Sequence, residues 1–130
     1  MQVKLSDLWN GWQALSKLGN ADLPAKKAYA LSRFLKKAAD EYDLLDKQRL
    51  KLIEKYGVPH ESGGQIVPPD NMGAFTTEFN EVLAGAVELP DLALTVDDLD
   101  GAKLSAIQFF TLAWLFDKDE PAEQATAANG

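Results

Sequence analysis

His60 is the single histidine of the sequence, and it stands beside Glu61 in a stretch rich in Gly, Pro and Ser. An imidazole next to a carboxylate is the kind of pair that moves protons in general acid–base catalysis. A lone histidine in a polar loop is more often simply exposed to water, and the chain has no cysteine that could act as a nucleophile. We therefore predict that the protein is not an enzyme.

Asp97, Asp98 and Asp100 form a candidate cation site, because clustered carboxylates suit hard ions such as Ca²⁺. Their spacing does not match the twelve-residue calcium loop, and no glutamate stands at the position that closes such a loop. The run is more typical of a turn that leads into a helix. Glycines 63 and 64 are not followed by the Gly-Lys-Ser/Thr of a phosphate-binding loop. We therefore predict neither a metal site nor a cofactor.

The composition is acidic, with a formal net charge of −7. Sequence-independent binding to nucleic acid or to anionic lipid needs a basic surface, so we expect neither as a partner. One cluster of cations stands out, and we interpret it as the basic half of a solvated helix face. It consists of Lys26, Lys27, Arg33, Lys36 and Lys37.

The absence of cysteine excludes disulfides and thiolate metal sites and is typical of a cytosolic protein. No run reaches the roughly 18 apolar residues that a membrane span requires, and residues 1–4 lack the apolar block of a signal peptide. At 130 residues the chain is most simply one domain, which we place at residues 1–116. Residues 117–130 are small, polar and acidic, and we expect a disordered acidic tail there.

The segment 24–56 carries the longest regular pattern and should position the other elements. Its apolar or partly apolar residues recur in alternating steps of three and four, which predicts one covered face of a long helix. They are Ala28, Leu31, Leu35, Ala38, Tyr42, Leu45, Arg49 and Leu52, widened by Phe34 and Ile53. Asp22 is placed to cap the start, Pro24 suits the first turn, and Gly57 in a left-handed conformation, followed by Pro59, should end the helix.

The other predicted elements are shorter. They are a strand over 1–5, a helix over 6–18 capped by Ser6, a loop or poor hairpin over 58–71, a helix over 77–84 capped by Thr76 or Thr77, and short strands over 87–89 and 92–96. We expect the first helix to form a helical hairpin with the central one, and the strands to form a small antiparallel sheet. Trp9 and Trp12 lie three apart on the apolar face of the first helix, which favours a place in the core. The fold class is α+β, mainly α.

Residues 106–116 form the most apolar predicted helix, and Ser105 is placed to cap it. A helix that is apolar nearly all round is either buried deeply or docked on a partner. We predict that part of it binds a partner, since aromatic side chains are common anchors of protein interfaces. The candidate partner-binding residues are Phe109, Phe110, Trp114, Leu115 and Phe116.

Four stretches resemble, in this order, a family of short phage and prophage proteins catalogued only as a domain of unknown function. They are LPAKKAYAL at 23–31, LIEKYG at 52–57, EFNEVL at 78–83 and VEL at 87–89. The resemblance covers about residues 3–116 and implies a phage origin, a shared fold and a location in the host bacterial cytoplasm or in the virion. It transfers no catalytic residue, because the matching stretches are caps and faces of helices.

Two functions fit these observations. The first is a non-enzymatic virion or assembly component, of the tail or neck, that interacts with other phage or host proteins and associates with itself, since the apolar face of 24–56 is longer than the first helix can cover. The second is a soluble inhibitor of a bacterial anti-phage defence protein, which would offer carboxylates where phosphates normally bind. We favour the first.

Overall fold

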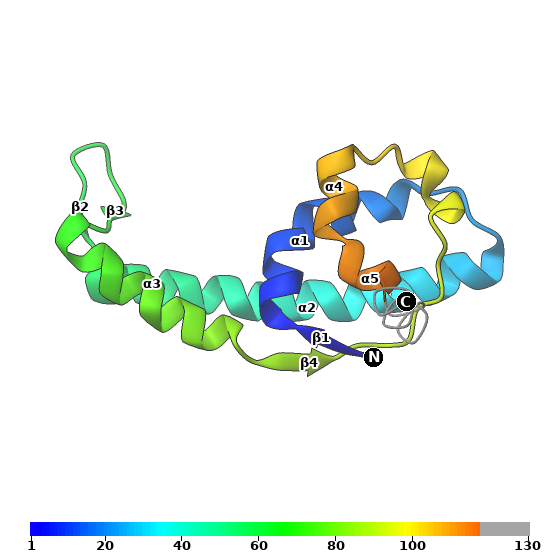
Figure 1. Cartoon of the computed structure of the whole chain (residues 1–130). Coiled ribbons are helices and arrows are strands. Elements are labelled where there is room, and N and C mark those ends of the chain that lie inside the picture. The colour runs from blue at the N-terminus through cyan, green and yellow to red at the C-terminus, as the bar shows by residue number, and fades with distance from the viewer. Residues whose placement is uncertain (118–130) are drawn as a thin grey trace, which may run out of the picture.

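The computed structural model describes residues 1–117, so the tail predicted at 117–130 lies, apart from Asp117, outside the described residues. Helices dominate, which confirms the mainly α, α+β class (Figure 1). The helices are α1 (Leu5–Lys17), α2 (Ala25–Tyr56), α3 (Pro69–Leu83), α4 (Ala106–Thr111) and α5 (Ala113–Asp117), with 3₁₀ helices η1 (Leu18–Asn20) and η2 (Asp97–Ala102). The strands are β1 (Gln2–Lys4), β2 (Val58–Pro59), β3 (Gln65–Ile66) and β4 (Ala86–Glu88).

The long helix α2 has the predicted length and ends, but its caps differ from those expected. Asp22 does not cap it; Pro24 is the N-cap residue, and its carbonyl accepts a hydrogen bond from the Ala28 N–H at 2.8 Å. Gly57 has φ −88° and ψ 163°, an extended rather than a left-handed conformation. The reason is that Gly57 connects α2 directly to β2, so its backbone already has the extended conformation of the strand that follows.

Every residue of the predicted apolar face of α2 is buried or half-buried, which confirms the face. Its largest fully buried side chain is Phe34, which is 0% exposed, whereas the neighbouring Leu35 is only half-buried. The outer face carries the predicted ion pairs between residues four apart. These are Lys36–Asp40 at 3.9 Å, Lys37–Glu41 at 3.5 Å and Lys47–Asp43 at 3.1 Å.

Helix α3 runs back beside the C-terminal half of α2, while α1 crosses α2 nearer its middle (Figure 1). The element that runs alongside α2 as an antiparallel partner is thus α3, and α1 packs across it. The expectation that part of the apolar face of α2 would be left uncovered is therefore wrong, because α3 covers what α1 does not reach.

Helix α3 begins earlier than the sequence predicts, since the prediction was a helix over 77–84 behind Thr76 or Thr77. The helix begins at Pro69, with Pro68 as its N-cap residue. Proline in the first turn needs no N–H partner and has a helical φ already, so the residues that resembled a loop in fact start the helix. The predicted poor hairpin is confirmed as β2–β3, in which Val58 pairs with Ile66.

Four aromatic rings join the three longest helices. Trp9 and Trp12 of α1 both stack on Tyr42 of α2 at 4.9 Å between ring centroids. The edge of Trp9 also meets Phe79 of α3 at 5.1 Å and 80°. The two tryptophans are therefore structural, as predicted, and fix the crossing of α1 over the α2–α3 pair.

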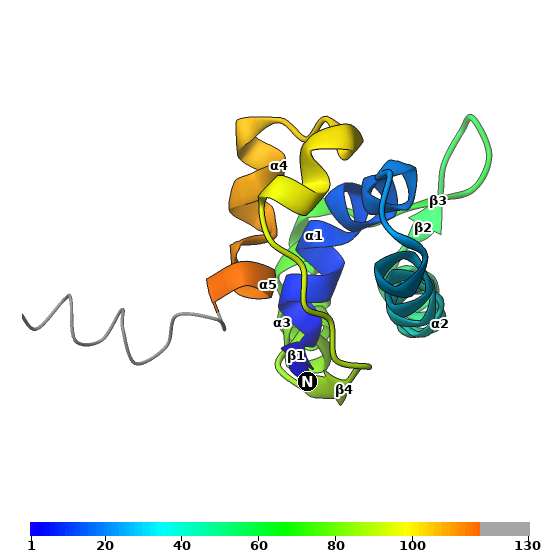
Figure 2. The same cartoon turned by 90° about the vertical axis from the view of Figure 1, so that its right-hand side faces the viewer.

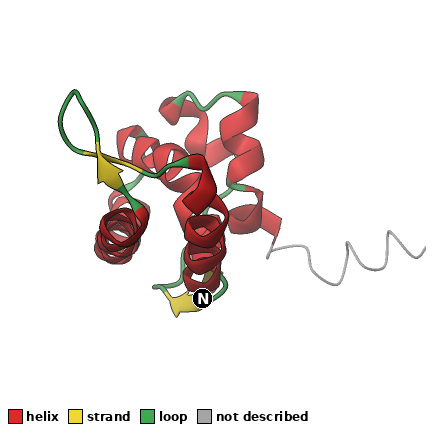
Figure 3. Cartoon of the chain, turned by 90° about the vertical axis from the view of Figure 1, so that its left-hand side faces the viewer, coloured by secondary structure: helices red, strands yellow, loops and turns green. Residues whose placement is uncertain are grey.

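The predicted small antiparallel sheet is confirmed, and its two strands are β1 and β4, with Val3 opposite Val87. Figure 3 shows the strands at the margins of the helical body. Two predictions fail here. Ser6 does not cap α1, because β1 runs straight into the helix and Lys4 is its N-cap residue. The segment 92–96 is not a strand: its alternation arises because Leu92 and Leu94 point into the core.

The C-terminal region folds as two short helices instead of the single predicted helix over 106–116. Ser105 caps α4 as predicted, and Gln108 completes a capping box in which each side chain accepts a hydrogen bond from the other residue's backbone N–H. The helix breaks at Leu112, which is fully buried. Figure 2, which looks along α2, shows α1 between α2 and the α4–α5 pair.

The end of α2 is attached to α3 by a polar contact. Lys55 Nζ and Tyr56 Oη both donate to Glu78 Oε1, each at 2.6 Å. These two donors hold the pKa of Glu78 below its ordinary value of 4.5, and the same contact raises the pKa of Lys55.

We expect Phe34→Ala to lower the free energy of unfolding by about 3–5 kcal/mol, because it empties a fully enclosed site. Leu35→Ala should cost clearly less, since that side chain is only half-buried. Urea denaturation of both variants measures the two losses. An equal or larger loss for Leu35→Ala would mean that the core face is misplaced.

Acid should weaken the α2–α3 contact. Because the folded pKa of Glu78 lies below the unfolded value, the carboxylate stabilises the fold above pH 4.5, and the stabilisation is lost as the pH falls through the folded pKa. Glu78→Gln should therefore be less stable than the wild type near neutral pH, with a difference that shrinks as the pH falls below 4.5. Denaturation over a pH series tests this, and a pH-independent difference would count against it.

Candidate partner-binding surfaces

The residues first considered for chemistry do not assemble into a reactive group. His60 lies exposed at the tip of the β2–β3 hairpin, where its Nδ1 is 2.6 Å from Ser62 Oγ, and among the described residues its side chain forms no hydrogen bond or ion pair with Glu61. Asp98 stabilises the turn at the start of η2. Its carboxylate accepts hydrogen bonds from the Thr95 N–H and from Lys27 Nζ, both at 2.9 Å. These donors lower its pKa. Within residues 1–117 no cluster of three potential ligands could hold a metal ion.

The five predicted partner-binding residues are divided by the structure. Leu115 is 2% exposed and belongs to the core. Phe109, Trp114 and Phe116 are half-buried and pack against the core cluster. Phe110, by contrast, is 81% exposed. Of the five, only Phe110 presents most of its side chain to solvent.

Ile107 joins Phe110 on the surface and is 75% exposed. The sequence analysis missed it, although its spacing of three from Phe110 places both on one face of a helix. We call Ile107 and Phe110 the α4 patch. Two large apolar side chains exposed one turn apart are unusual, and such positions often mark a contact with another protein.

A hollow of about 380 Å³ adjoins the α4 patch. It is lined by Asp7 and Asn10 from α1 and by Phe110, Thr111, Ala113 and Trp114 from the C-terminal region. Its wall is held in place by a hydrogen bond of 2.9 Å from Trp114 Nε1 to the Thr111 carbonyl.

The close approach of α1 to this wall depends on Gly11. A Cβ atom at Gly11 would lie 3.1 Å from the Thr111 carbonyl oxygen and 3.3 Å from the Leu112 side chain, closer than most real contacts. The glycine thus lets the C-terminal helices pack directly on α1, which sets the position of the α4 patch.

A second surface lies along the N-terminal half of α2, where two hollows of about 500 and 630 Å³ separate the helix from residues 88–94. The two hollows lie end to end between α2 and residues 88–94. The first is lined by residues from 33–40 and 88–90, and the second by residues from 26–30 and 91–94. We call them together the α2 groove. All five members of the basic cluster line it: Lys26, Lys27, Arg33, Lys36 and Lys37.

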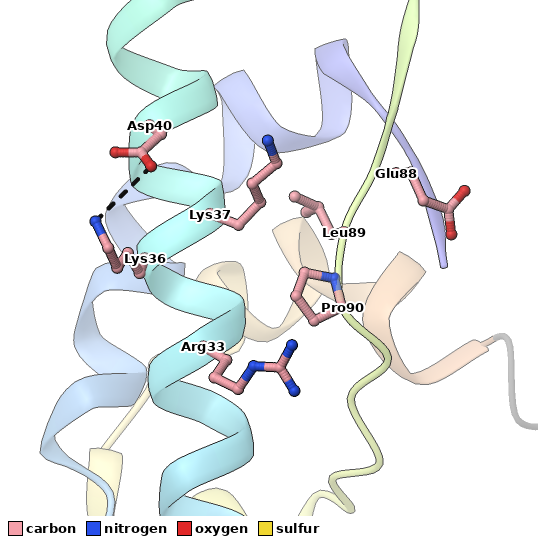
Figure 4. A pocket seen from close by; sticks show the side chains of 7 residues that line it. All are labelled: Arg33, Lys36, Lys37, Asp40, Glu88, Leu89 and Pro90. Carbon is pink, nitrogen blue, oxygen red and sulfur yellow. Dashed lines mark ion pairs between the residues drawn. The ribbon is translucent and has the colours of Figure 1, made fainter.

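Figure 4 shows how the side chains lie in the first hollow. Arg33 extends from α2 toward the segment of Pro90 and Lys37 reaches into the space beside Leu89, whereas Lys36 turns aside to Asp40. The basic cluster was predicted to be an ordinary solvated helix face, because nothing in the sequence places residues 88–94 beside it.

Comparisons with protein-family models, with curated proteins and with solved structures find no match for this chain. The resemblance to a phage family therefore stays a prediction. None of the helices in the described part of the chain combines the length and apolar character needed to cross a bilayer.

The role of Gly11 is tested by a matched pair of Gly→Ala variants in two helices. A Cβ atom at Gly73 in α3 would meet nothing within 4 Å, so Gly73→Ala should raise the free energy of unfolding by about 0.5–1 kcal/mol through helix propensity. Gly11→Ala should give no such gain and should lower stability, because the methyl group presses on Thr111. If thermal or urea denaturation showed equal gains in stability for both variants, a methyl group would fit between α1 and α4 and the role of Gly11 would be wrong.

Proposed function

We propose that this chain is a non-enzymatic protein–protein interaction module encoded by a bacteriophage, a virion or assembly component that associates with copies of itself in the host cytoplasm. The observation that carries the proposal is the α4 patch, with Ile107 75% and Phe110 81% exposed. The phage origin is supported by the resemblance of segments 23–31, 52–57, 78–83 and 87–89.

The patch and its hollow suit a second copy of the chain. Phe110 is at once the most exposed residue of the patch and part of the wall of the hollow. In a two-fold pair the same surface faces itself, so the Phe110 ring of each copy can enter the hollow of the other. Ala113 and Trp114 supply apolar surface for such a ring to contact.

The strength of this association can be bounded. Burying a large apolar side chain contributes about 1.5–3 kcal/mol, so the two residues from each of two copies contribute about 6–12 kcal/mol. Association itself costs about 4–15 kcal/mol in lost translational and rotational freedom. The patch alone thus supports a weak pair, formed in the micromolar range or above, which further contacts in an assembled particle would reinforce.

Sedimentation velocity over about 5–200 μM, a range set by this bound, tests the proposal. We expect the wild-type chain to sediment faster as its concentration rises, and Phe110→Ser to stay a folded monomer of 14.2 kDa. Tyr29→Ser is the matched control, since Tyr29 is an aromatic residue 68% exposed on α2, outside the patch. A wild-type monomer at every concentration, or equal loss of association in both variants, would overturn self-association through α4.

A further inference from the structure

We infer that the α2 groove binds an extended acidic segment of a partner protein. This site is distinct from the α4 patch and does not depend on it. The inference rests on the arrangement of charge along α2, on the length of the groove and on the apolar residues that line it.

Charge is segregated along α2. Between Asp22 and Asp40 the sequence has five cations and no acidic residue, although the whole chain has a net charge of −7. Lys26, Arg33 and Lys37 follow one another at steps of seven and four, which places them on one side of the helix. They form a row of positive charge along the α2 wall of the groove.

The length of this row suits a short piece of extended chain. From Lys26 to Lys37 the helix rises about 16 Å, at about 1.5 Å per residue. An extended strand covers that distance in about five residues, at about 3.3 Å each. Residues 88–94 form the opposite wall over the same length, so the segment would lie between α2 and this wall.

The cations are available to a ligand. Neither Lys26 nor Arg33 forms an ion pair within residues 1–117, and both are exposed. Lys37 pairs with the half-buried Glu41 at 3.5 Å, and pairs between residues four apart on a helix contribute only about 0.3–0.5 kcal/mol. An incoming carboxylate can replace such a partner at little cost. Arg33 can in addition bind a carboxylate through two parallel hydrogen bonds.

The other features of the groove favour a protein segment over nucleic acid. Pro90 and Ala93 line the groove beside the buried side chains of Leu89, Leu92 and Leu94, so the surface offers apolar contacts between the charged ones. Asp40, Glu88 and Asp91 also line the groove, and their charges oppose a continuous phosphate backbone more strongly than a peptide whose carboxylates are spaced two residues apart. A peptide that alternates carboxylates with apolar side chains can contact both the cations of α2 and the apolar residues of the groove.

The test measures the binding of a dye-labelled hexapeptide, in which Glu alternates with Leu, to the full chain by fluorescence anisotropy. We expect saturable binding that weakens severalfold when salt is raised from about 50 to about 250 mM. Arg33→Glu combined with Lys37→Glu should weaken binding at least tenfold. The control, Lys47→Glu combined with Lys51→Glu, makes the same change in net charge on the other half of α2 and should alter affinity less than twofold. Circular dichroism verifies that both double variants are folded.

Four results would each overturn the inference. Equal weakening by both double variants would show a mere effect of net charge. Equal binding of a peptide with Gln in place of Glu would show that carboxylates are not recognised. Tighter binding of a single-stranded oligonucleotide of the same charge, lost in the Arg33 and Lys37 variant, would assign the groove to nucleic acid. A groove variant that changes sedimentation but not peptide binding would assign it to a second copy of the chain.

Discussion

The apolar face of α2 has to be covered over about 48 Å, and this requirement organises the molecule. No other helix of the described chain is half as long, so the covering is shared among elements distant in sequence. Helix α3 covers the C-terminal half, the Trp9 and Trp12 rings of α1 cover the middle around Tyr42, and η1 and η2 lie near the start, where Lys27 binds Asp98.

The chain itself covers the core face of α2, and the two candidate binding surfaces lie at the margins of the elements that provide this covering. One is the α2 groove, where residues 88–94 pass beside the helix without filling the space between them. The other is the outer side of α4, which packs through its inner side on α1 and so leaves Ile107 and Phe110 exposed. The two surfaces differ in chemistry: the groove is basic with apolar residues along it, and the patch is apolar.

Much of the secondary structure follows from residues that lie within one turn of each other. The period of three and four along 24–56 identified α2 and its covered face, and Ser105 with Gln108 formed the expected cap of α4. The failures came where two local patterns compete. Prolines 68 and 69 suit a loop as well as a helix start, and the alternation over 92–96 suits a strand as well as a coil whose leucines point into the core.

By itself the sequence determined most of the helices and the basic cluster, since helical periodicity, caps and charge depend on near neighbours. Which aromatic residues of 106–116 reach the surface was decided by tertiary structure: buried Leu112 breaks the helix and turns Leu115 inward, while Phe110 stays outside. The α2 groove likewise exists only because residues 88–94 fold back beside 26–40. Contacts between segments so far apart in the chain depend on how all the apolar faces are buried together, which no local pattern records.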